Sequence, residues 1–205
     1  MRDLAVFGAS GHGKVVADMA ECLGWRVSFF DDGIEAGTLT SVWPVLGGTE
    51  ALLASMTRFD GVVVAIGNNR VRLEKLRVIE DAGGTLVSLI HPGASVSRHA
   101  NLGAGTVVMA GAVINVDASL GKGCIVNTGA TIDHDCILGD GVHVSPGANV
   151  AGTVNIGTGS WVGIGAAVRQ LINIGKFCSI GAGAVVIGDV PDGLTVAGVP
   201  AAEIR

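Results

Sequence analysis

Hydrophobic and polar positions follow two different patterns along this 205-residue chain, and the pattern changes near residue 90. Before that point, short apolar runs alternate with segments in which apolar residues recur every three or four positions. The apolar runs predict strands at residues 4–7, 27–30, 62–66 and 86–89, and the other segments predict helices at 14–23, near 49–53 and at 70–81. Strands that alternate with helices predict an open, mostly parallel sheet, so we expect residues 1–89 to form a small Rossmann-like α/β domain.

Beyond residue 89, an aliphatic residue occupies every sixth position without interruption. These positions are Ile90, Val96, Leu102, Val108, Ile114, Leu120, Val126, Ile132, Leu138, Val144, Val150, Ile156, Val162, Val168, Ile174, Ile180 and Val186. A period this strict predicts a solenoid whose aliphatic side chains point into the core. We therefore expect residues 90–205 to form an all-β, parallel β-helix of hexapeptide repeats that ends in a C-terminal cap.

A second period of eighteen residues lies on top of the first. It is carried by glycines that follow the aliphatic position, namely Gly103, Gly121, Gly139, Gly157 and Gly175. Three hexads therefore make one coil of a triangular prism, and successive coils stack about 4.8 Å apart. This register places Gly152 over His134 and Trp161 over His143. The two histidines are half a coil apart, so we expect them on different sides of one chain.

Composition limits the possible partners and compartment. The formal net charge of −5 argues against nucleic acid as the main partner. No apolar run is long enough to cross a bilayer, and the first residues do not resemble a signal peptide. The four cysteines lack CxxC spacing, and Cys124, Cys136 and Cys178 fall on inward positions, where we expect core packing rather than nucleophiles. We expect a cytoplasmic protein without membrane insertion.

His134 and Asp135 are the strongest candidates for catalysis in the repeat region. A histidine titrates near neutral pH and can accept a proton when a second group fixes its tautomer. Gly152 has no side chain, so a thioester can approach the imidazole there. Its backbone N–H is then a candidate donor to the oxyanion that forms.

The first domain carries signals of a ligand cleft. The turn from Gly8 to Gly13 opens a helix whose first N–H groups can receive a phosphate, although its glycines depart from the GxGxxG spacing. Four polar residues follow the second and third predicted strands, namely Asp31, Asp32, Asn68 and Asn69. Parallel sheets bind ligands at these carboxyl ends.

The motifs that carry a family likeness are residues 8–13, 31–32, 65–69 and 198–201, together with Asn127, His134–Asp135 and His143. On these motifs the chain resembles the hexapeptide-repeat, left-handed β-helix N-acetyltransferases that modify nucleotide-linked 4-amino sugars. Sialic acid O-acetyltransferases are close relatives of that group. The resemblance implies a homotrimer without a metal, acetyl-CoA bound between adjacent β-helices, and a nucleotide-linked amino sugar held by the first domain.

The resemblance also implies a role for individual residues. The expected catalytic residues are His134, Asp135, Asn127, His143 and Gly152. The expected nucleotide-sugar contacts are Ser10, Gly11, His12, Asp31, Asp32, Gly67, Asn68 and Asn69. The expected acetyl-CoA contacts are His143, Gly152, Gly163, Gly165, Ala166, Gly181, Val199 and Pro200. The family often has Glu where this chain has Asp135, so the sequence leaves open whether Asp135 reaches His134.

The expected activity is direct acetyl transfer from acetyl-CoA to the 4-amino group of a nucleotide-linked 4-amino-4,6-dideoxy sugar, with His134 as the general base. A UDP-linked sugar is favoured and a GDP-linked sugar is possible. The closest alternative is a sugar O-acetyltransferase of the sialic acid type. A γ-type carbonic anhydrase would need a third zinc histidine. A nicotinamide oxidoreductase would leave the β-helix unused, and a non-catalytic scaffold would leave His134–Asp135 without a use.

Overall fold

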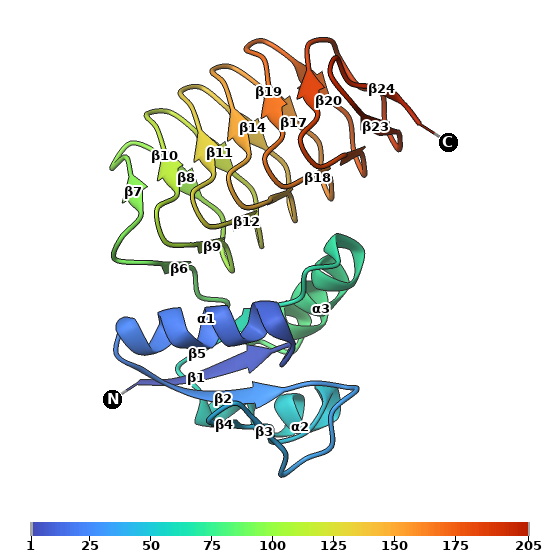
Figure 1. Cartoon of the computed structure of the whole chain (residues 1–205). Coiled ribbons are helices and arrows are strands. Elements are labelled where there is room, and N and C mark those ends of the chain that lie inside the picture. Colours follow the sequence, from blue (N-terminus) through green and yellow to red (C-terminus); the bar gives the residue numbers. More distant parts are fainter. Residues whose placement is uncertain (1, 205) are drawn as a thin grey trace. The chain divides into compact units, whose positions relative to one another are not determined.

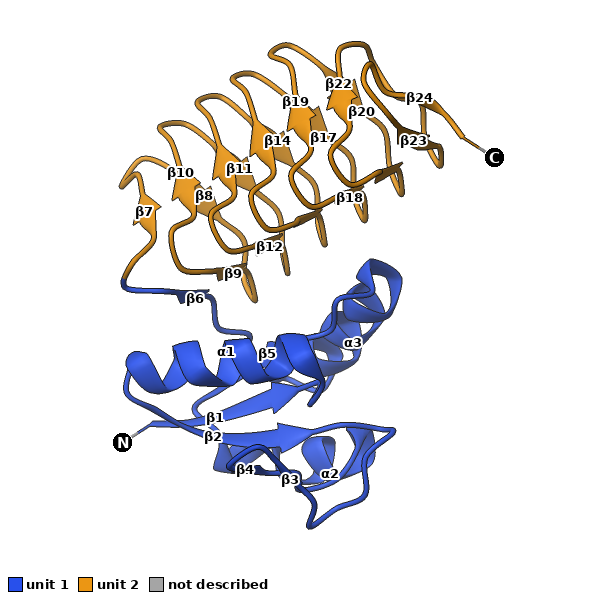
Figure 2. Cartoon of the chain, viewed as in Figure 1, with its two compact units in different colours: residues 1–92 blue, residues 93–205 orange. Residues whose placement is uncertain are grey.

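A computed structural model describes residues 2–204 and divides the chain into two compact units, residues 1–92 and 93–205 (Figure 2). We call them unit 1 and unit 2. The sequence pattern predicted the boundary at residue 89/90. The structure places it three residues later, because the strand β6 (Leu89–Ile90) belongs to unit 1.

Unit 1 is built on a three-stranded parallel sheet with the order β2-β1-β5 (Figure 1). The strands are β1 (Arg2–Phe7), β2 (Trp25–Phe30) and β5 (Gly61–Val64). They coincide with the first three predicted strands and are mostly buried, as expected for a parallel sheet covered on both faces.

Three helices cover this sheet: α1 (Gly11–Cys22), α2 (Thr49–Ala54) and α3 (Asn69–Asp81). Leu52 of α2 packs with Leu76 and Ile79 of α3 against the face that carries Ala5 and Phe7. Helix α1 lies on the opposite side of the sheet from α2 (Figure 1). The alternation of side chains along β1 therefore serves two separate helix-sheet contacts.

The smaller elements of unit 1 depart from the sequence pattern. A hairpin of β3 (Leu39–Thr40) and β4 (Trp43–Pro44) and a 3-10 turn (Met56–Arg58) were not predicted. The predicted strand at residues 86–89 does not form as one strand, because Leu86 makes a single parallel bridge to Val62 and Leu89 belongs to β6. The apolar run was too short to distinguish a strand from an extended connection.

Unit 2 is a parallel β-solenoid of two-residue strands arranged in three sheets (Figure 1). One sheet contains β7 (Ser95–Val96), β10 (Val113–Ile114), β13 (Thr131–Ile132), β16 (Asn149–Val150), β19 (Ala167–Val168) and β22 (Val185–Val186). The second contains β8 (Asn101–Leu102), β11 (Ser119–Leu120), β14 (Ile137–Leu138), β17 (Asn155–Ile156) and β20 (Asn173–Ile174). To the third sheet, unit 2 contributes β9 (Val107–Val108), β12 (Ile125–Val126), β15 (His143–Val144), β18 (Trp161–Val162), β21 (Ser179–Ile180), β23 (Thr195–Ala197) and β24 (Ala202–Glu203).

The strands of unit 2 pair in the predicted eighteen-residue register. Thr131 pairs with Asn149, and His143 pairs with Trp161, so each residue lies against the one a full coil later. At the C-terminal end, β24 pairs antiparallel with β23, which ends the parallel stacking. The prediction of three hexads per coil is confirmed.

The repeated aliphatic residues form the core of unit 2. All of them are buried except Ile90, Val96 and Leu102, at the start of the series. Cys124, Cys136 and Cys178 are at most 1% exposed and belong to the same core, as predicted. Among the helices of residues 2–204, none has the length and apolar character that a membrane crossing requires.

Candidate active site

His134 lies at the corner that follows strand β13, with its side chain 52% exposed. Its Nδ1 lies 2.7 Å from Oδ2 of Asp135, so the shorter aspartate does reach the imidazole. Asp135 has a φ of 59°, a left-handed conformation that Asp tolerates better than most residues. The turn therefore brings the two neighbouring side chains together.

This contact fixes the proton on the imidazole. A carboxylate only accepts, so Nδ1–H donates to Asp135 and Nε2 keeps its lone pair. The hydrogen bond to Asp135 raises the pKa of His134 above its ordinary 6.5, and the negative charges of Asp133 and Asp135 act in the same direction. His134 is thus an exposed base whose reactive nitrogen is Nε2.

Gly152 lies directly over this imidazole, one coil above. A Cβ atom at Gly152 would lie 2.6 Å from both Nε2 and Cε1 of His134, so only glycine fits there without displacing the ring. The corresponding amide in the coil below, that of His134, donates to Oδ1 of Asp133 at 2.8 Å. In the coil of Gly152, the position of Asp133 is occupied by Ala151, which has no side-chain acceptor for the Gly152 N–H. We call residues 133–135 with 151–153 the His134 corner.

His143 lies in β15 and is only 8% exposed. Its ring stacks on Trp161, with centroids 5.6 Å apart and planes 5° from parallel, as the coil register predicted. Asn127 Oδ1 accepts the Thr128 N–H at 2.9 Å, so its Nδ2 faces His143 Nε2 at 3.2 Å as the donor. Nε2 is therefore the acceptor, and the neutral ring carries its proton on Nδ1.

A hollow of about 460 Å³ lies on the face of unit 2 that carries His143. Of the expected acetyl-CoA contacts, His143, Gly163 and Gly181 line it, and Trp161 and Ile164 add an exposed apolar surface. Three other expected contacts, Gly165, Val199 and Pro200, are exposed but do not line the hollow.

Ala166 departs from the expectation. Its side chain is fully buried in the core, because it occupies the small inward position of its repeat. The methyl group is therefore unable to reach a ligand on the surface. Any contact of Ala166 with acetyl-CoA would have to use its backbone.

One chain does not bring all five expected catalytic residues together. His134, Asp135 and Gly152 meet at one corner, and Asn127 meets His143 in a different sheet. A carbonic anhydrase would require a group of at least three side chains that hold a metal ion. No such group of His, Cys, Asp or Glu is found within residues 2–204.

In unit 1, the glycine turn leads from β1 into α1. Gly8 has a φ of 107°, and a Cβ at Gly13 would collide with the Gly8 carbonyl oxygen, so both positions require glycine. Ser10 is the N-cap residue, yet its side chain makes no capping hydrogen bond. Ser10 therefore supplies no side-chain acceptor at the positive end of the helix.

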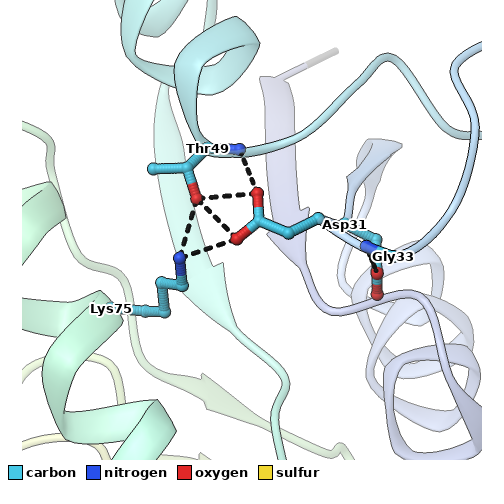
Figure 3. Close-up of polar contacts among 5 residues, drawn as sticks. Asp31, Gly33, Thr49 and Lys75 are labelled. Atoms are coloured by element: carbon cyan, nitrogen blue, oxygen red, sulfur yellow. Dashed lines mark hydrogen bonds and ion pairs between the residues drawn. The ribbon is translucent and has the colours of Figure 1, made fainter.

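The two aspartates after β2 are bonded within unit 1. Asp31 accepts the Ala9 N–H through Oδ2 and the Gly33 N–H through Oδ1, both at 2.8 Å. Asp32 accepts the Thr49 N–H at 2.7 Å and the Lys75 ammonium at 2.7 Å, and Figure 3 shows Thr49 and Lys75 beside each other. The hydrogen bond from Lys75 is the main reason that the pKa of Asp32 is lowered.

The residues after β5 are also engaged within the unit. Asn68 caps α3 by accepting the N–H groups of Arg70 and Val71. Arg72, 1% exposed, donates from Nη2 to Asn69 Oδ1 and from Nη1 to the carbonyls of Ile66 and Gly67. These three protein acceptors replace the water that the guanidinium loses on burial.

His12 lies on the first turn of α1 and is largely buried. Burial lowers its pKa to about 4, and the positive charge of Arg72 acts in the same direction. The imidazole is therefore uncharged at neutral pH. It can donate or accept a hydrogen bond there without bringing a positive charge.

Comparisons with known proteins show which family the chain belongs to. The model of the PglD N-terminal domain matches residues 3–79. The acetyltransferase domain of PglB from Neisseria gonorrhoeae FA1090, solved in complex with acetyl coenzyme A, is 47% identical, with a TM-score of 0.95 over 99% of both chains. The chain belongs to the hexapeptide-repeat β-helix acetyltransferases.

Two further relatives lie in the same family. PerB from Caulobacter crescentus, solved in complex with CoA and GDP-perosamine, is 38% identical, with a TM-score of 0.94 over 99% of this chain and 97% of that chain. A UDP-N-acetylbacillosamine N-acetyltransferase of Bacillus subtilis is 38% identical over 121 residues. That match spans 54% of this chain and about half, 52%, of the relative.

Sequence reasoning missed three residues that shape the candidate sites of this acetyltransferase. Arg72 shares a helical face with Leu76 and Ile79, and a charged residue in an apolar stripe was a signal to look for a buried partner. Asp133 is eighteen residues after Asn115, so the coil register could have shown their contact. Lys75 carried no comparable signal, because its partner Asp32 lies 43 residues earlier.

Proposed function

We propose that this protein transfers the acetyl group of acetyl-CoA to the 4-amino group of a nucleotide-linked 4-amino-4,6-dideoxy sugar. The observation that carries the proposal is the His134 corner, where an exposed imidazole with a free Nε2 lone pair lies below a glycine. The names of the relatives support the choice of substrates. The PglB domain binds acetyl coenzyme A, and PerB binds CoA and GDP-perosamine.

In the proposed mechanism, His134 Nε2 takes a proton from the sugar ammonium. The free amine attacks the thioester carbonyl, a C–N bond forms, and the Gly152 N–H donates to the oxyanion. The intermediate collapses as the C–S bond breaks. CoA leaves as the thiolate and takes up the proton released by the new amide nitrogen. No acyl-enzyme is formed, and His134 returns its proton to solvent.

We extend the proposal to a homotrimer with sites shared between copies. His134 lies at the corner after β13, and His143 lies in β15 of a different sheet, so a neighbouring chain would have to present His143 and Asn127 near His134. The hollow lined by His143, Gly163 and Gly181 would then hold acetyl-CoA. Nδ1 of His143 is buried, so the ring would line the site beside the acetyl carbonyl rather than donate a proton to it.

Unit 1 is the proposed binding domain for the nucleotide sugar. The first amides of α1, at Gly11 and His12, together with Ser10, would receive the phosphates. Asp31, Asp32, Asn68 and Asn69 already have internal partners, so we propose that with Gly67 they mainly shape the rim of the site.

The nucleotide and the compartment belong to the same proposal. A UDP-linked sugar is favoured, in line with the bacillosamine relative, and PerB keeps a GDP-linked sugar as the second choice. We place the enzyme in the cytoplasm, where acetyl-CoA is available and where its four cysteines stay reduced.

A turnover assay that follows CoA release tests this function. It would use acetyl-CoA with UDP-, GDP- and dTDP-linked 4-amino sugars, and free sialic acid as the hydroxyl acceptor. We expect turnover with a nucleotide-linked amine, fastest with the UDP-linked sugar, and none with sialic acid. Turnover with sialic acid alone would replace the proposal by the O-acetyltransferase alternative.

A further inference from the structure

Asp133 precedes His134 in the corner and connects it to the coil below. Its Oδ1 accepts the His134 backbone N–H at 2.8 Å and the Nδ2 amide of Asn115 at 2.8 Å. Asn115 lies eighteen residues earlier, in the preceding coil. The carboxylate is thus held from below while it holds the main chain of His134.

This arrangement occurs in a single coil of the solenoid. The residues stacked in the same column as Asp133 are Ser97, Asn115, Ala151, Arg169 and Ile187. None of these five is a carboxylate, so the column has its carboxylate only in the coil that carries the imidazole. A side chain needed only to build the turn would be expected in the other coils as well.

We propose that Asp133 is a positioning residue for His134: clamped by Asn115, it fixes the main chain that carries the imidazole and places a second negative charge beside it. Asp135 then orients the ring through Nδ1, while Asp133 orients its backbone. The inference rests on the proposed role of His134 as the base. A base displaced by even about 1 Å loses much of its rate.

The charges around the imidazole support this assignment. The hydrogen bond from Asn115 is the main reason that the pKa of Asp133 is lowered, so the residue is ionised at neutral pH. Its charge then helps to raise the pKa of His134, after the hydrogen bond to Asp135. Asp117 lies one coil below Asp135, the coil above has no titratable residue at 151–153, and Arg169 lies two coils above Asp133.

Two substitutions separate position from charge, and a third is the control. Asp133→Asn keeps an oxygen acceptor for both donors and removes the charge. Asp133→Ala removes the acceptor and the charge. Asp117→Asn removes a carboxylate from the same corner one coil lower, where Asp117 has a φ of 61° that Asn also tolerates.

The experiment combines the pH dependence of kcat with an NMR titration of His134, whose resonance is identified by its loss in His134→Ala. We expect Asp133→Ala to lower kcat about tenfold with KM nearly unchanged, and Asp133→Asn to recover most of that loss. Both should move the pKa of His134 and the acidic limb of kcat to lower pH. Asp117→Asn should leave kcat and the pKa unchanged.

Wild-type kcat together with a wild-type His134 titration in Asp133→Ala would overturn the inference. A shift in Asp117→Asn as large as that in Asp133→Asn would also overturn it, because the effect would then come from total charge. The titration separates this inference from the proposed function. Full activity in His134→Ala would contradict the assignment of His134 as the base. The pKa of His134 measured by NMR in the Asp133 variants would still test the effect of Asp133.

Discussion

In unit 1, the polar side chains at the ends of the parallel strands are held by hydrogen bonds within the unit, whereas in unit 2 the His134 corner holds only one ring nitrogen of the imidazole and leaves Nε2 for a substrate. Asp32 is tied to Lys75 and Thr49, and Asn69 to a buried Arg72. The side chains of His134, Asp135 and Asp32 are all about half exposed, at 52%, 57% and 50%, so the two units differ in bonding and not in exposure. A carboxylate therefore stabilises the framework in unit 1, at Asp32, and orients a reactive imidazole in unit 2, at Asp135.

The comparison implies that changes in unit 2 should mainly lower the rate, and changes at these positions of unit 1 should mainly lower stability. If copies share each active site, a change in unit 2 of one chain should lower the rate at a site that it forms with its neighbour.

Mixed trimers test whether the site needs two chains. His134→Ala should lose about 100-fold or more in kcat because it removes the base. His143→Ala should lose about tenfold or more because it removes the ring that would line the acetyl site. Any cyclic trimer that contains both variants has one intact site of three, so activity should return to about one third of wild type. The measurement uses two affinity tags to purify mixed trimers after co-expression.

Parent trimers of each variant are the controls in that experiment. Mixed trimers no more active than the parents would show that the two histidines do not serve a shared site. A protein that remains monomeric in solution would contradict the same proposal.

Gly152→Ala should lower kcat about tenfold or more, because the new Cβ would lie 2.6 Å from Nε2 and Cε1 of His134 and would push the ring away. Gly188→Ala is the matched control. Gly188 lies in the same column two coils higher, and a Cβ there would meet nothing within 4 Å. Equal kcat values in the two variants, measured by CoA release, would remove Gly152 from the site.

The pH dependence of kcat tests the pairing of His134 with Asp135. The base works only when unprotonated, so kcat should rise with pH through a pKa above the ordinary 6.5. Asp135→Asn removes the carboxylate that stabilises the imidazolium, so the rising limb should move to lower pH. An unchanged limb in Asp135→Asn would contradict the assignment of that pKa to His134.

Asp32→Ala tests unit 1. The substitution removes the acceptor for the Thr49 N–H and for Lys75, and the lost cap should cost about 1 kcal/mol of unfolding free energy. The half-exposed ion pair adds little to that figure. Asp18→Ala, an exposed carboxylate of α1, is the charge-matched control and should change stability by less than about 0.5 kcal/mol.

Thermal and denaturant unfolding measure this effect, and KM for the nucleotide sugar is measured alongside. An unchanged unfolding free energy with a many-fold higher KM would return Asp32 to the ligand contact that its place at the strand end suggested. That result would break the contrast between the two units.

Much of the fold followed from the sequence because its signal is periodic. A strict spacing of six and eighteen residues fixes which side chains point inward and which lie above one another, so the position of Gly152 over His134 was predictable. The hairpin at residues 39–44 and the loss of the strand at 86–89 were not, because short extended segments have no period to read.

The candidate sites were only partly predictable for a related reason. The direct contact of His134 with Asp135 depends on the left-handed turn at Asp135, which the sequence does not show. The partners of Asp32 come from α2 and α3, and such contacts between distant segments follow from packing rather than from local pattern. Strand-end polarity alone did not distinguish a ligand contact from a framework contact.

The most direct test of the central claim is the turnover of His134→Ala with acetyl-CoA and the best nucleotide-linked amino sugar, measured together with the affinity for both substrates. The account predicts that kcat falls about 100-fold or more while both dissociation constants stay within about twofold. A variant that keeps near wild-type kcat would show that His134 is not the base.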